Sequence, residues 1–349
     1  MATRILSLIK PIFRENFTAW WKKFRARPSL PAELVSMIDH YTCTPDVKDL
    51  HDIWRWHARH NIEQLATHGL ENFKQTAAKN YFTWRGSKAV NYWYEPIIND
   101  EKRMDFIVNM NQVTKKHALL TMDESIQQNI ITIALYHDFI KKNGTEWFNK
   151  IEEPSFGNPA FVTIDGHRIT QDLLNSLVES ITVMKELPRL SSVIEIGAGG
   201  GRTAHAFLSL NHGLKYTIVD IPPALYISQQ YLSSQFSGSK IIFKFRPFSN
   251  FDDIKEEFNA ADIAFLTPDQ MRLLPSARFD VFLAIDCLAE MKPAVVCFYF
   301  DQASRLARSI YIKSVLFRHE YPDSWKQVYE RKMALPRSFF ESFHEIIPR

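Results

Sequence analysis

Helical hydrophobic patterns dominate residues 1 to about 150, whereas the rest of the chain alternates strand and helix patterns. The run 121–143 repeats apolar positions three and four residues apart, which predicts an amphipathic helix. Two β-prone runs flank an Asp-Gly pair within 161–169 and indicate a hairpin. A further helix is predicted over 170–187, directly before the next strand.

Short apolar runs rich in β-branched and aromatic residues recur after residue 190, separated by helical stretches. Four of them are predicted as strands: 192–196, 215–220, 279–285 and 309–314. Another strand lies at either 241–245 or 262–266, and 262–266 is favoured for the core because a loop and a helix separate it from the following strand. Such alternation predicts a parallel sheet with crossover helices. We therefore expect an α/β domain over 151–349 behind a helical domain over 1–150.

A cluster of glycines follows the predicted strand 192–196. Four of the eleven glycines in the chain stand within five positions, at Gly197, Gly199, Gly200 and Gly201. Glycine is needed where the backbone takes a positive φ or where a ligand approaches it without a Cβ in the way. The helix expected after the cluster would present its amino end to a carboxylate or a phosphate. The cluster therefore predicts a turn that binds a nucleotide-like ligand.

The spacing of these glycines narrows the class of ligand. A dinucleotide fingerprint needs a third glycine where Arg202 stands, and a P-loop needs a Gly-Lys-Ser/Thr that does not follow here. The spacing that fits is acid-x-Gly-x-Gly-x-Gly, starting at Glu195, which is the first motif of S-adenosylmethionine (SAM) methyltransferases. In that motif the acid can engage the ammonium group of the ligand, and the turn admits its adenosine and methionyl parts.

A second acid supports a SAM site. Asp220 ends the strand 215–220, nineteen positions after Gly201, where a carboxylate can accept both ribose hydroxyls. An ordinary strand-end aspartate is the alternative. The residues expected to bind the cofactor are Glu195, Gly197, Ala198, Gly199, Gly201, Asp220, Ile221, Leu266, Thr267 and Asp286. Of these, Leu266 and Thr267 would flank the adenine.

Methyl transfer from a sulfonium is an in-line displacement that depends on positioning and on removal of the acceptor proton. Ligands of doubly wound sheets meet at the carboxyl ends of the strands, so the loop after 279–285 is where a base is expected. Asp286 and Glu290 are the acids in that loop. Glu290 is favoured as the base because it lies further out, and Asp286 is placed near the methionyl part. The alternative for Glu290 is a helix-start carboxylate that serves the helix dipole.

No metal is expected. Two carboxylates in one loop could hold Mg²⁺, but nothing else in the chain requires a metal. His51, His57 and His60 resemble a cluster, yet His57 and His60 are three positions apart and no third ligand has suitable spacing. A solvated or hydrogen-bonded helix face is the favoured interpretation of these histidines.

Bulk composition is that of an ordinary globular protein, with 46% hydrophobic and 23% charged residues. The net charge of +3 comes from interspersed charges, so a nucleic-acid partner is not expected. The three cysteines, Cys43, Cys287 and Cys297, form neither a disulfide framework nor a zinc pattern, which favours a reducing cytoplasm. No apolar run is long enough for a membrane span.

The segment 5–14 is basic and apolar but is broken by Lys10 and Pro11. It lacks the small-residue cleavage site of a signal peptide. We expect a helix that packs on the rest of the domain, and a peripheral helix at the inner face of the membrane is the alternative.

Tryptophan is concentrated in the predicted helical domain. Seven of the eight tryptophans lie before residue 150: Trp20, Trp21, Trp54, Trp56, Trp84, Trp93 and Trp147. Aromatic faces stack on the C–H faces of sugars, so this domain could bind a glycan acceptor. A helical core or the subunit interface of a homo-oligomer is the alternative.

From about 146 to 316 the chain resembles a family of sugar O-methyltransferases found in bacterial surface-glycan gene sets. The segments that carry the resemblance are FGNP at 156–159, QDLLNS at 171–176, EIGAGGGRTAH at 195–205, YTIVDIPPALY at 216–226 and LAEM at 288–291. The first 145 residues match more loosely. The family often has a tyrosine where Gly200 stands, and serine and glutamine near Cys287 and Ala289. The first departure could widen the mouth of the SAM site, and the second could change the choice of acceptor or weaken catalysis.

This resemblance implies a Rossmann-like class I SAM methyltransferase domain that methylates a sugar hydroxyl of a surface polysaccharide or of its nucleotide- or lipid-linked precursor. It also implies that Gln171, Asp172 and Asn175 line the acceptor pocket, unless they are polar residues on a solvated helix face. Two other functions stay open: SAM-dependent methylation of another small metabolite, and a non-catalytic SAM-binding assembly module. Acceptor profiling would separate the first of these from sugar methylation.

Overall fold

The structure of the protein is a computed structural model that describes residues 17–25, 30–43, 52–76, 122–315, 320–333 and 339–347, with the backbone alone described at 52–56 and 122–128. Helices make up the described part of the first 150 residues. They are α2 (Phe17–Phe24), α3 (Ala32–Cys43), α4 (Asp52–His68), the short η2 (Leu70–Asn72), α8 (Met122–Asn143) and the short η3 (Glu146–Asn149). The expected helix over 121–143 is thus confirmed as α8.

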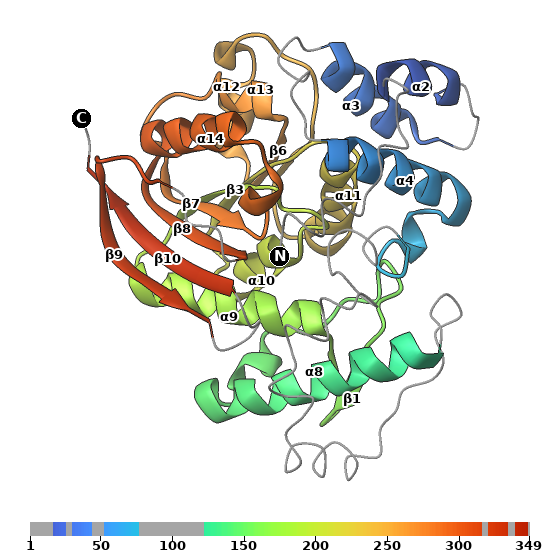
Figure 1. Cartoon of the computed structure of the whole chain (residues 1–349), viewed down its shortest axis with the longest axis vertical. Helices are drawn as coiled ribbons and strands as arrows, with labels where there is room; N and C mark the ends of the chain where they lie inside the picture. Colours follow the sequence, from blue (N-terminus) through green and yellow to red (C-terminus); the bar gives the residue numbers. More distant parts are fainter. Residues whose placement is uncertain are drawn as a thin grey trace.

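A hairpin and a long helix lead into the sheet (Figure 1). β1 (Val162–Ile164) and β2 (His167–Ile169) pair antiparallel around an Asp-Gly turn, whose two residues have positive φ values of 50° and 85°. α9 (Gln171–Glu186) begins after Thr170, whose side chain accepts a hydrogen bond from a backbone N–H of the first turn. The predicted hairpin and helix are both confirmed.

Eight strands form one sheet in the order β5-β6-β4-β3-β7-β8-β10-β9. They are β3 (Ser192–Ile196), β4 (Lys215–Val219), β5 (Ile242–Phe243), β6 (Ile263–Leu266), β7 (Phe279–Ile285), β8 (Ala307–Val315), β9 (Trp325–Lys332) and β10 (Phe339–Ile346). The strands from β5 to β8 in this order run parallel, and β10 is antiparallel to both of its neighbours. Without the edge strand β5, the order along the chain is 3-2-1-4-5-7-6 with the seventh strand reversed, which is the Rossmann-like class I methyltransferase arrangement. The expected α/β fold class is confirmed.

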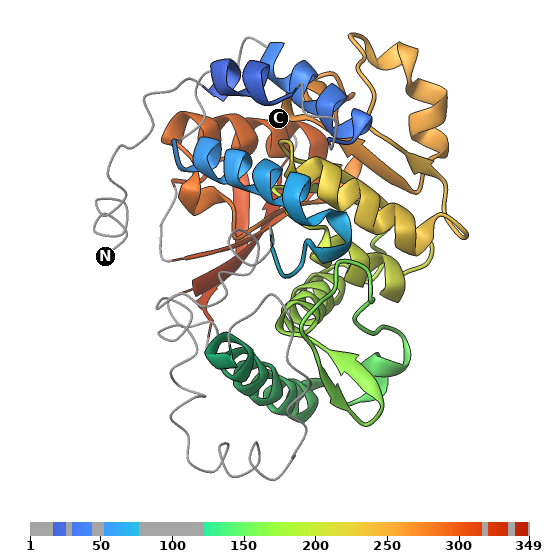
Figure 2. The ribbon, with the colours of Figure 1, turned by 90° about the vertical axis from the view of Figure 1, so that its right-hand side faces the viewer.

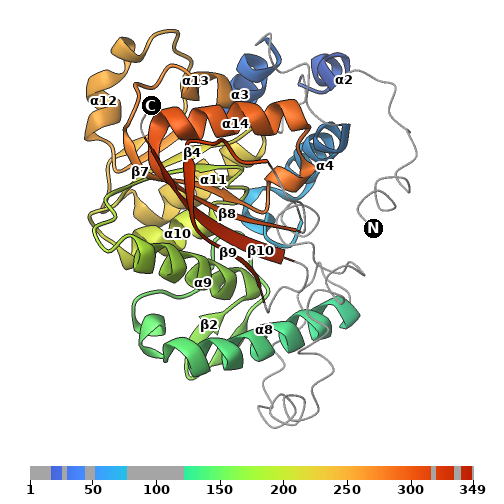
Figure 3. The ribbon, with the colours of Figure 1, turned by 60° about the vertical axis from the view of Figure 1, so that its left-hand side comes forward.

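Helices cover both faces of the sheet, as Figure 3 shows. α10 (Arg202–Leu210) and α11 (Ala224–Phe236) join α9 on one face, and α12 (Lys255–Ala260), α13 (Pro268–Met271) and α14 (Pro293–Leu306) lie on the other. Val193 of β3 packs in the first of the two resulting cores and its neighbour Ile194 in the second, because successive side chains of a strand point to opposite faces.

Predicted and observed core strands agree to within two residues at each end. The run 262–266 supplies the core strand β6, as favoured, and the competing run 241–245 contributes the two-residue edge strand β5. The hydrophobic pattern does not predict β9 and β10. In β10 the buried side chains include Glu341, Ser342 and His344, so the strand lacks the apolar alternation that reveals a half-buried strand.

The N-terminal helices α2, α3 and α4 lie against the sheet domain (Figure 2), and residues of these helices share a hydrophobic core with it. Trp21 of α2 and Met37 of α3 belong to the same buried cluster as Phe207 of α10. Trp20 and Trp21 are 6% and 1% exposed, and the indole N–H of Trp21 donates to Asp39 (2.8 Å). These two tryptophans are therefore core residues, in line with the alternative to glycan binding. The division of the chain at residue 150 stays a prediction.

Within the described residues, no helix combines the length and hydropathy that crossing a bilayer requires. All three cysteines are free: Cys287 is buried, and Cys43 and Cys297 are exposed. Several expectations fall outside the described residues or side chains, namely those on 5–14, His51, Trp54, Trp56, Trp84 and Trp93.

Candidate active site

A glycine turn links β3 to α10 at the carboxyl edge of the sheet. Gly197, Gly199 and Gly201 have positive φ values of 64°, 59° and 80°, and Gly201 is the N-cap of α10. At Gly197 a Cβ would lie 2.6 Å from the Cβ of Cys287, so this part of the turn can pass the loop after β7 only without a side chain. The turn therefore lies directly against the loop that carries Asp286.

Asp220 braces this turn from the end of β4. Its side chain is buried; Oδ2 accepts a hydrogen bond from the backbone N–H of Gly199 (2.8 Å), and Oδ1 accepts one from that of Ile221 (2.7 Å). Burial raises the pKa of Asp220 to about 7, against the lowering effect of these two bonds. The backbone N–H of Asp220 donates to the carbonyl of Leu266 (3.2 Å), and Thr267 follows as the buried residue before α13. The structure thus brings these expected cofactor residues together.

Glu195 lies on β3, two residues before Gly197, and points into the core. It is 2% exposed and accepts a hydrogen bond from the hydroxyl of Tyr216 (2.8 Å). Burial raises the pKa of Glu195 to about 8, so the protonated form dominates at neutral pH, and a cation beside it would favour the ionised form. Ala198 belongs to the same hydrophobic cluster as Tyr216. That Glu195 engages an ammonium group stays a prediction.

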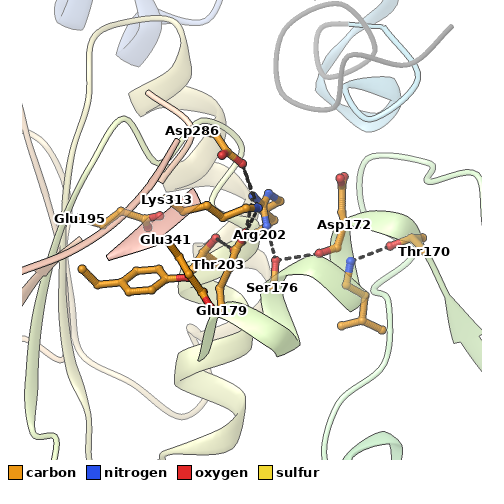
Figure 4. Close-up of polar contacts among 12 residues, drawn as sticks. Thr170, Asp172, Ser176, Glu179, Glu195, Arg202, Thr203, Asp286, Lys313 and Glu341 are labelled. Atoms are coloured by element: carbon orange, nitrogen blue, oxygen red, sulfur yellow. Dashed lines mark hydrogen bonds and ion pairs between the residues drawn. The ribbon is translucent and has the colours of Figure 1, made fainter. Parts of the chain in front are cut away.

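Glu179 of α9 joins three elements beside the turn. Its carboxylate is buried and accepts two hydrogen bonds from Arg202 (2.8 and 3.1 Å), one from Lys313 (2.7 Å) and one from the Thr203 hydroxyl (3.1 Å). Burial would raise the pKa of Glu179, but the charges of Arg202 and Lys313 outweigh it and hold that pKa at about 2. Figure 4 shows the two cations meeting Glu179 from α10 and β8.

Asp286 contacts the same two cations from the loop after β7. Its Oδ2 is 3.2 Å from Nζ of Lys313 and 3.6 Å from Nη2 of Arg202. Its Oδ1 has no hydrogen-bond partner among the described residues, and the side chain is 30% exposed. Burial raises the pKa of Asp286, and the charge of Lys313 opposes that rise. One oxygen of this carboxylate is therefore held by cations, while the other is buried without a hydrogen-bond partner among the described residues.

Glu290 ends the short helix η5 (Leu288–Glu290), which follows Asp286. Its side chain is half-buried, and burial together with the charge of Asp286 raises the pKa of Glu290 to about 8. Glu290 precedes the first turn of α14, which contains no acidic residue. A carboxyl that titrates near neutrality is suited to accept a proton.

The three residues expected to line an acceptor pocket begin α9. Gln171 and Asp172 are 6% and 7% exposed, so the solvated-face alternative is wrong for them, and Asn175 is half-buried. Asp172 interacts electrostatically with Arg202. These residues thus begin the helix that carries Glu179, and their contact with an acceptor stays a prediction.

The sequence pattern does not predict the ionic cluster of Glu179, Arg202 and Lys313. In the sequence, Arg202 stands out only as a departure from the dinucleotide pattern. Lys313 carried the clearest signal, because a lysine inside a predicted buried strand needs a partner for its charge. Tyr216, the partner of Glu195, had no signal beyond an aromatic residue in a strand.

Among the described residues, no three histidine, cysteine or acidic side chains gather as a metal ion would require. His57 is buried, and burial together with the charge of His60 lowers its pKa to about 4. A surface hollow of about 880 Å³ is lined mainly by α3, and one of about 540 Å³ is lined by residues of α11 and of the segments around it. Neither hollow includes a residue of the glycine turn or of the ionic cluster. We favour the carboxyl edge of the sheet as the active site because the glycine turn and the ionic cluster meet there.

No protein-family model matches the sequence, and no curated protein matches it. The resemblance to sugar O-methyltransferases is therefore carried by the motifs of the chain alone. Solved structures with a similar fold include mitomycin 7-O-methyltransferase, which is 12% identical over 50% of this chain and 54% of its own, with a TM-score of 0.35. The chain thus spans about half the length of that enzyme.

Two further solved structures are similar over about half of this chain. A protein from Pyrococcus horikoshii is 14% identical over 49% of this chain and 90% of its own, with a TM-score of 0.35. The Burkholderia thailandensis 1,6-didemethyltoxoflavin-N1-methyltransferase, solved with 1,6-didemethyltoxoflavin and S-adenosylhomocysteine, is 16% identical over 51% of this chain and 79% of its own, with a TM-score of 0.36.

Proposed function

We propose that the protein is a SAM-dependent methyltransferase. The observation that carries the proposal is the glycine turn at the switch point of the sheet, with the carboxylate of Asp220 hydrogen-bonded to it. β3 leads to α10 on one face and β7 leads to α14 on the other, so their two loops diverge at the carboxyl edge. Doubly wound sheets bind their ligands in the crevice at this position.

The polar groups at the turn fit those of SAM. Each carboxylate oxygen of Asp220 accepts one backbone hydrogen bond and keeps a lone pair for a ribose hydroxyl. Oδ1 of Asp286, which lacks a partner among the described residues, fits an ammonium group. The amino end of α10 begins at Gly201 without a side-chain cap, which fits a carboxylate.

Bound SAM would supply a methyl group on a sulfonium, which is open to in-line displacement. The chain would supply the base. Ionised Glu290 would accept the proton of the attacking hydroxyl, and its pKa of about 8 makes it a stronger base than an ordinary glutamate. Lys313 and Arg202 would hold Asp286 in place beside it.

We propose a sugar hydroxyl as the acceptor, in a surface polysaccharide or its precursor. The support is the sequence resemblance of the segments between 156 and 291. Gln171 and Asp172 offer buried hydrogen-bonding groups at the start of α9, which suit a polyhydroxylated ligand. Incubation with SAM and panels of nucleotide sugars and of aromatic metabolites tests this point: S-adenosylhomocysteine formed only with the aromatic panel would reject the sugar.

Calorimetric titration with SAM and S-adenosylhomocysteine tests the cofactor. The Asp220→Ala variant should lose at least about tenfold in affinity for both, because the proposed hydrogen bonds of this side chain to the ribose disappear. Asp280→Ala is the matched control. Asp280 also accepts two backbone hydrogen bonds, from Ser191 (2.9 Å) and Ser192 (3.0 Å), but at the opposite edge of the sheet. Absence of binding to the folded wild-type protein would reject the proposal.

A further inference from the structure

Glu179 has no direct role in the proposed reaction, yet it is among the most buried charged groups of the described residues. Its side chain is 1% exposed, and its two oxygens face the two cations Arg202 and Lys313. Both cations also approach Asp286, at 3.6 and 3.2 Å. Glu179 therefore shares both cations with Asp286. Through them, its charge can affect the charge around Asp286 without a contact between Glu179 and a ligand.

We propose that Glu179 is a positioning residue that adapts the site to a positively charged cofactor. By neutralising one of the two cations, it leaves the negative charge of Asp286 available to the ligand. The inference rests on the proposed function, because it takes SAM as the ligand.

The distances indicate that both cations pair more closely with Glu179 than with Asp286. Lys313 lies closer to Glu179 (2.7 Å) than to Asp286 (3.2 Å). Arg202 donates two hydrogen bonds to Glu179, at 2.8 and 3.1 Å, but stays 3.6 Å from Asp286. Both contacts to Asp286 are made by Oδ2, which leaves Oδ1 without a partner among the described residues. Without the charge of Glu179, Asp286 would be the carboxylate closest to Lys313, and the positive charge of the two cations beside it would be offset less.

SAM and its product S-adenosylhomocysteine differ in charge, so a comparison of their binding affinities can test the role of Glu179. SAM carries a sulfonium, an ammonium and a carboxylate, so its net charge is positive. S-adenosylhomocysteine keeps the ammonium and the carboxylate but has a neutral thioether. A change in the charge of the site acts more strongly on SAM than on S-adenosylhomocysteine, whereas a loss of shape weakens both by the same factor.

The experiment is calorimetric titration of the full chain with SAM and with S-adenosylhomocysteine, for the wild type and Glu179→Gln. The variant should weaken SAM binding about tenfold more than S-adenosylhomocysteine binding, as expected for the loss of one charge near the ligand. Glu153→Gln is the matched control. Glu153 is equally buried, pairs with Lys74 and accepts a hydrogen bond from the Thr170 hydroxyl (2.7 Å), and its variant should leave the ratio of the two affinities unchanged.

A second variant keeps the test decisive if Glu179→Gln does not fold. Lys313→Met removes one cation while Glu179 keeps Arg202, so the ratio should move the other way, in favour of SAM. An unchanged ratio in the folded variant would overturn the inference while leaving the proposed function intact. If the wild-type protein binds neither ligand, the proposed function itself fails.

Discussion

At the scale of single residues, burial controls the ionisation of the carboxyls around the glycine turn. It is the largest cause that raises the pKa values of Glu195, Asp220 and Glu290, to about 8, 7 and 8. Glu195 is hydrogen-bonded inside the core and Asp220 braces the turn, whereas Glu290 is the least buried of the three. A raised pKa on a side chain that reaches the edge of the site favours Glu290 as the base.

Replacement of Glu290 by glutamine should leave SAM affinity unchanged and lower turnover by about a hundredfold, because the base is lost while the site keeps its shape. In the wild type, turnover should rise with pH and level off above about 8, since the base must be ionised. Turnover and SAM affinity measured across this pH range check both statements. Asp301→Asn, at an exposed carboxylate of α14, is the control. Unchanged turnover in Glu290→Gln would remove Glu290 from the mechanism.

At the scale of elements, α9 connects the hairpin region to the ionic cluster. Its N-cap, Thr170, accepts a hydrogen bond from the backbone N–H of Leu173 (3.0 Å) and donates one to Oε2 of Glu153 (2.7 Å). About two and a half turns further on, Glu179 binds Arg202 and Lys313. A change at the start of this helix therefore removes a cap and leaves a buried carboxylate without one of its donors.

Thr170→Ala should lower the free energy of unfolding by about 2 kcal/mol, from the lost cap and the lost hydrogen bond to Glu153. Thr170→Ser keeps the hydroxyl and should retain most of that stability. Urea unfolding of the two variants and the wild type measures the difference. Equal destabilisation by alanine and serine would mean that the methyl group of Thr170, and not its hydroxyl, stabilises the helix.

Local pattern was enough to predict α9, the hairpin and the parallel core strands, because each depends on residues close in the chain. The glycine turn and Asp220 were also predictable, since both lie at the ends of consecutive strands. The contact between Glu179 and Lys313 was not, because it joins positions 134 residues apart through tertiary packing that periodicity does not encode. β10 was not predictable for a related reason: Glu341, one of its buried polar residues, accepts hydrogen bonds from Tyr311 and Arg331 on the two neighbouring strands.

At the scale of the whole molecule, two sets of buried groups oppose each other in their response to pH. Burial lowers the pKa values of three histidines to about 4, so the folded chain keeps them neutral: His57, His205 and His344. Burial raises the pKa values of three carboxyls to between about 7 and 8, so the folded chain keeps them protonated: Glu195, Asp220 and Glu290. The unfolded chain titrates both sets near their ordinary values.

Between pH 4.5 and 6.5, which are the ordinary pKa values of glutamate and histidine, the unfolded chain binds extra protons at the histidines. The folded chain binds extra protons at the carboxyls, so the two contributions to the pH dependence cancel. Above pH 6.5 the histidine contribution ends and the carboxyl contribution continues until about pH 8. Between pH 6.5 and 8 the folded state binds more protons than the unfolded state. The free energy of unfolding therefore falls by about 1.4 kcal/mol per pH unit for each extra proton bound.

Urea unfolding across this range should therefore show a plateau between pH 4.5 and 6.5 and a decline from pH 6.5 to about 8. Glu195→Gln stays neutral, keeps an acceptor for Tyr216, and should make the decline shallower. His205→Asn should leave the decline in place but tilt the plateau, because one histidine no longer offsets a carboxyl. Stability that rises from pH 6.5 to 8 would show that these carboxyls are ionised in the folded protein.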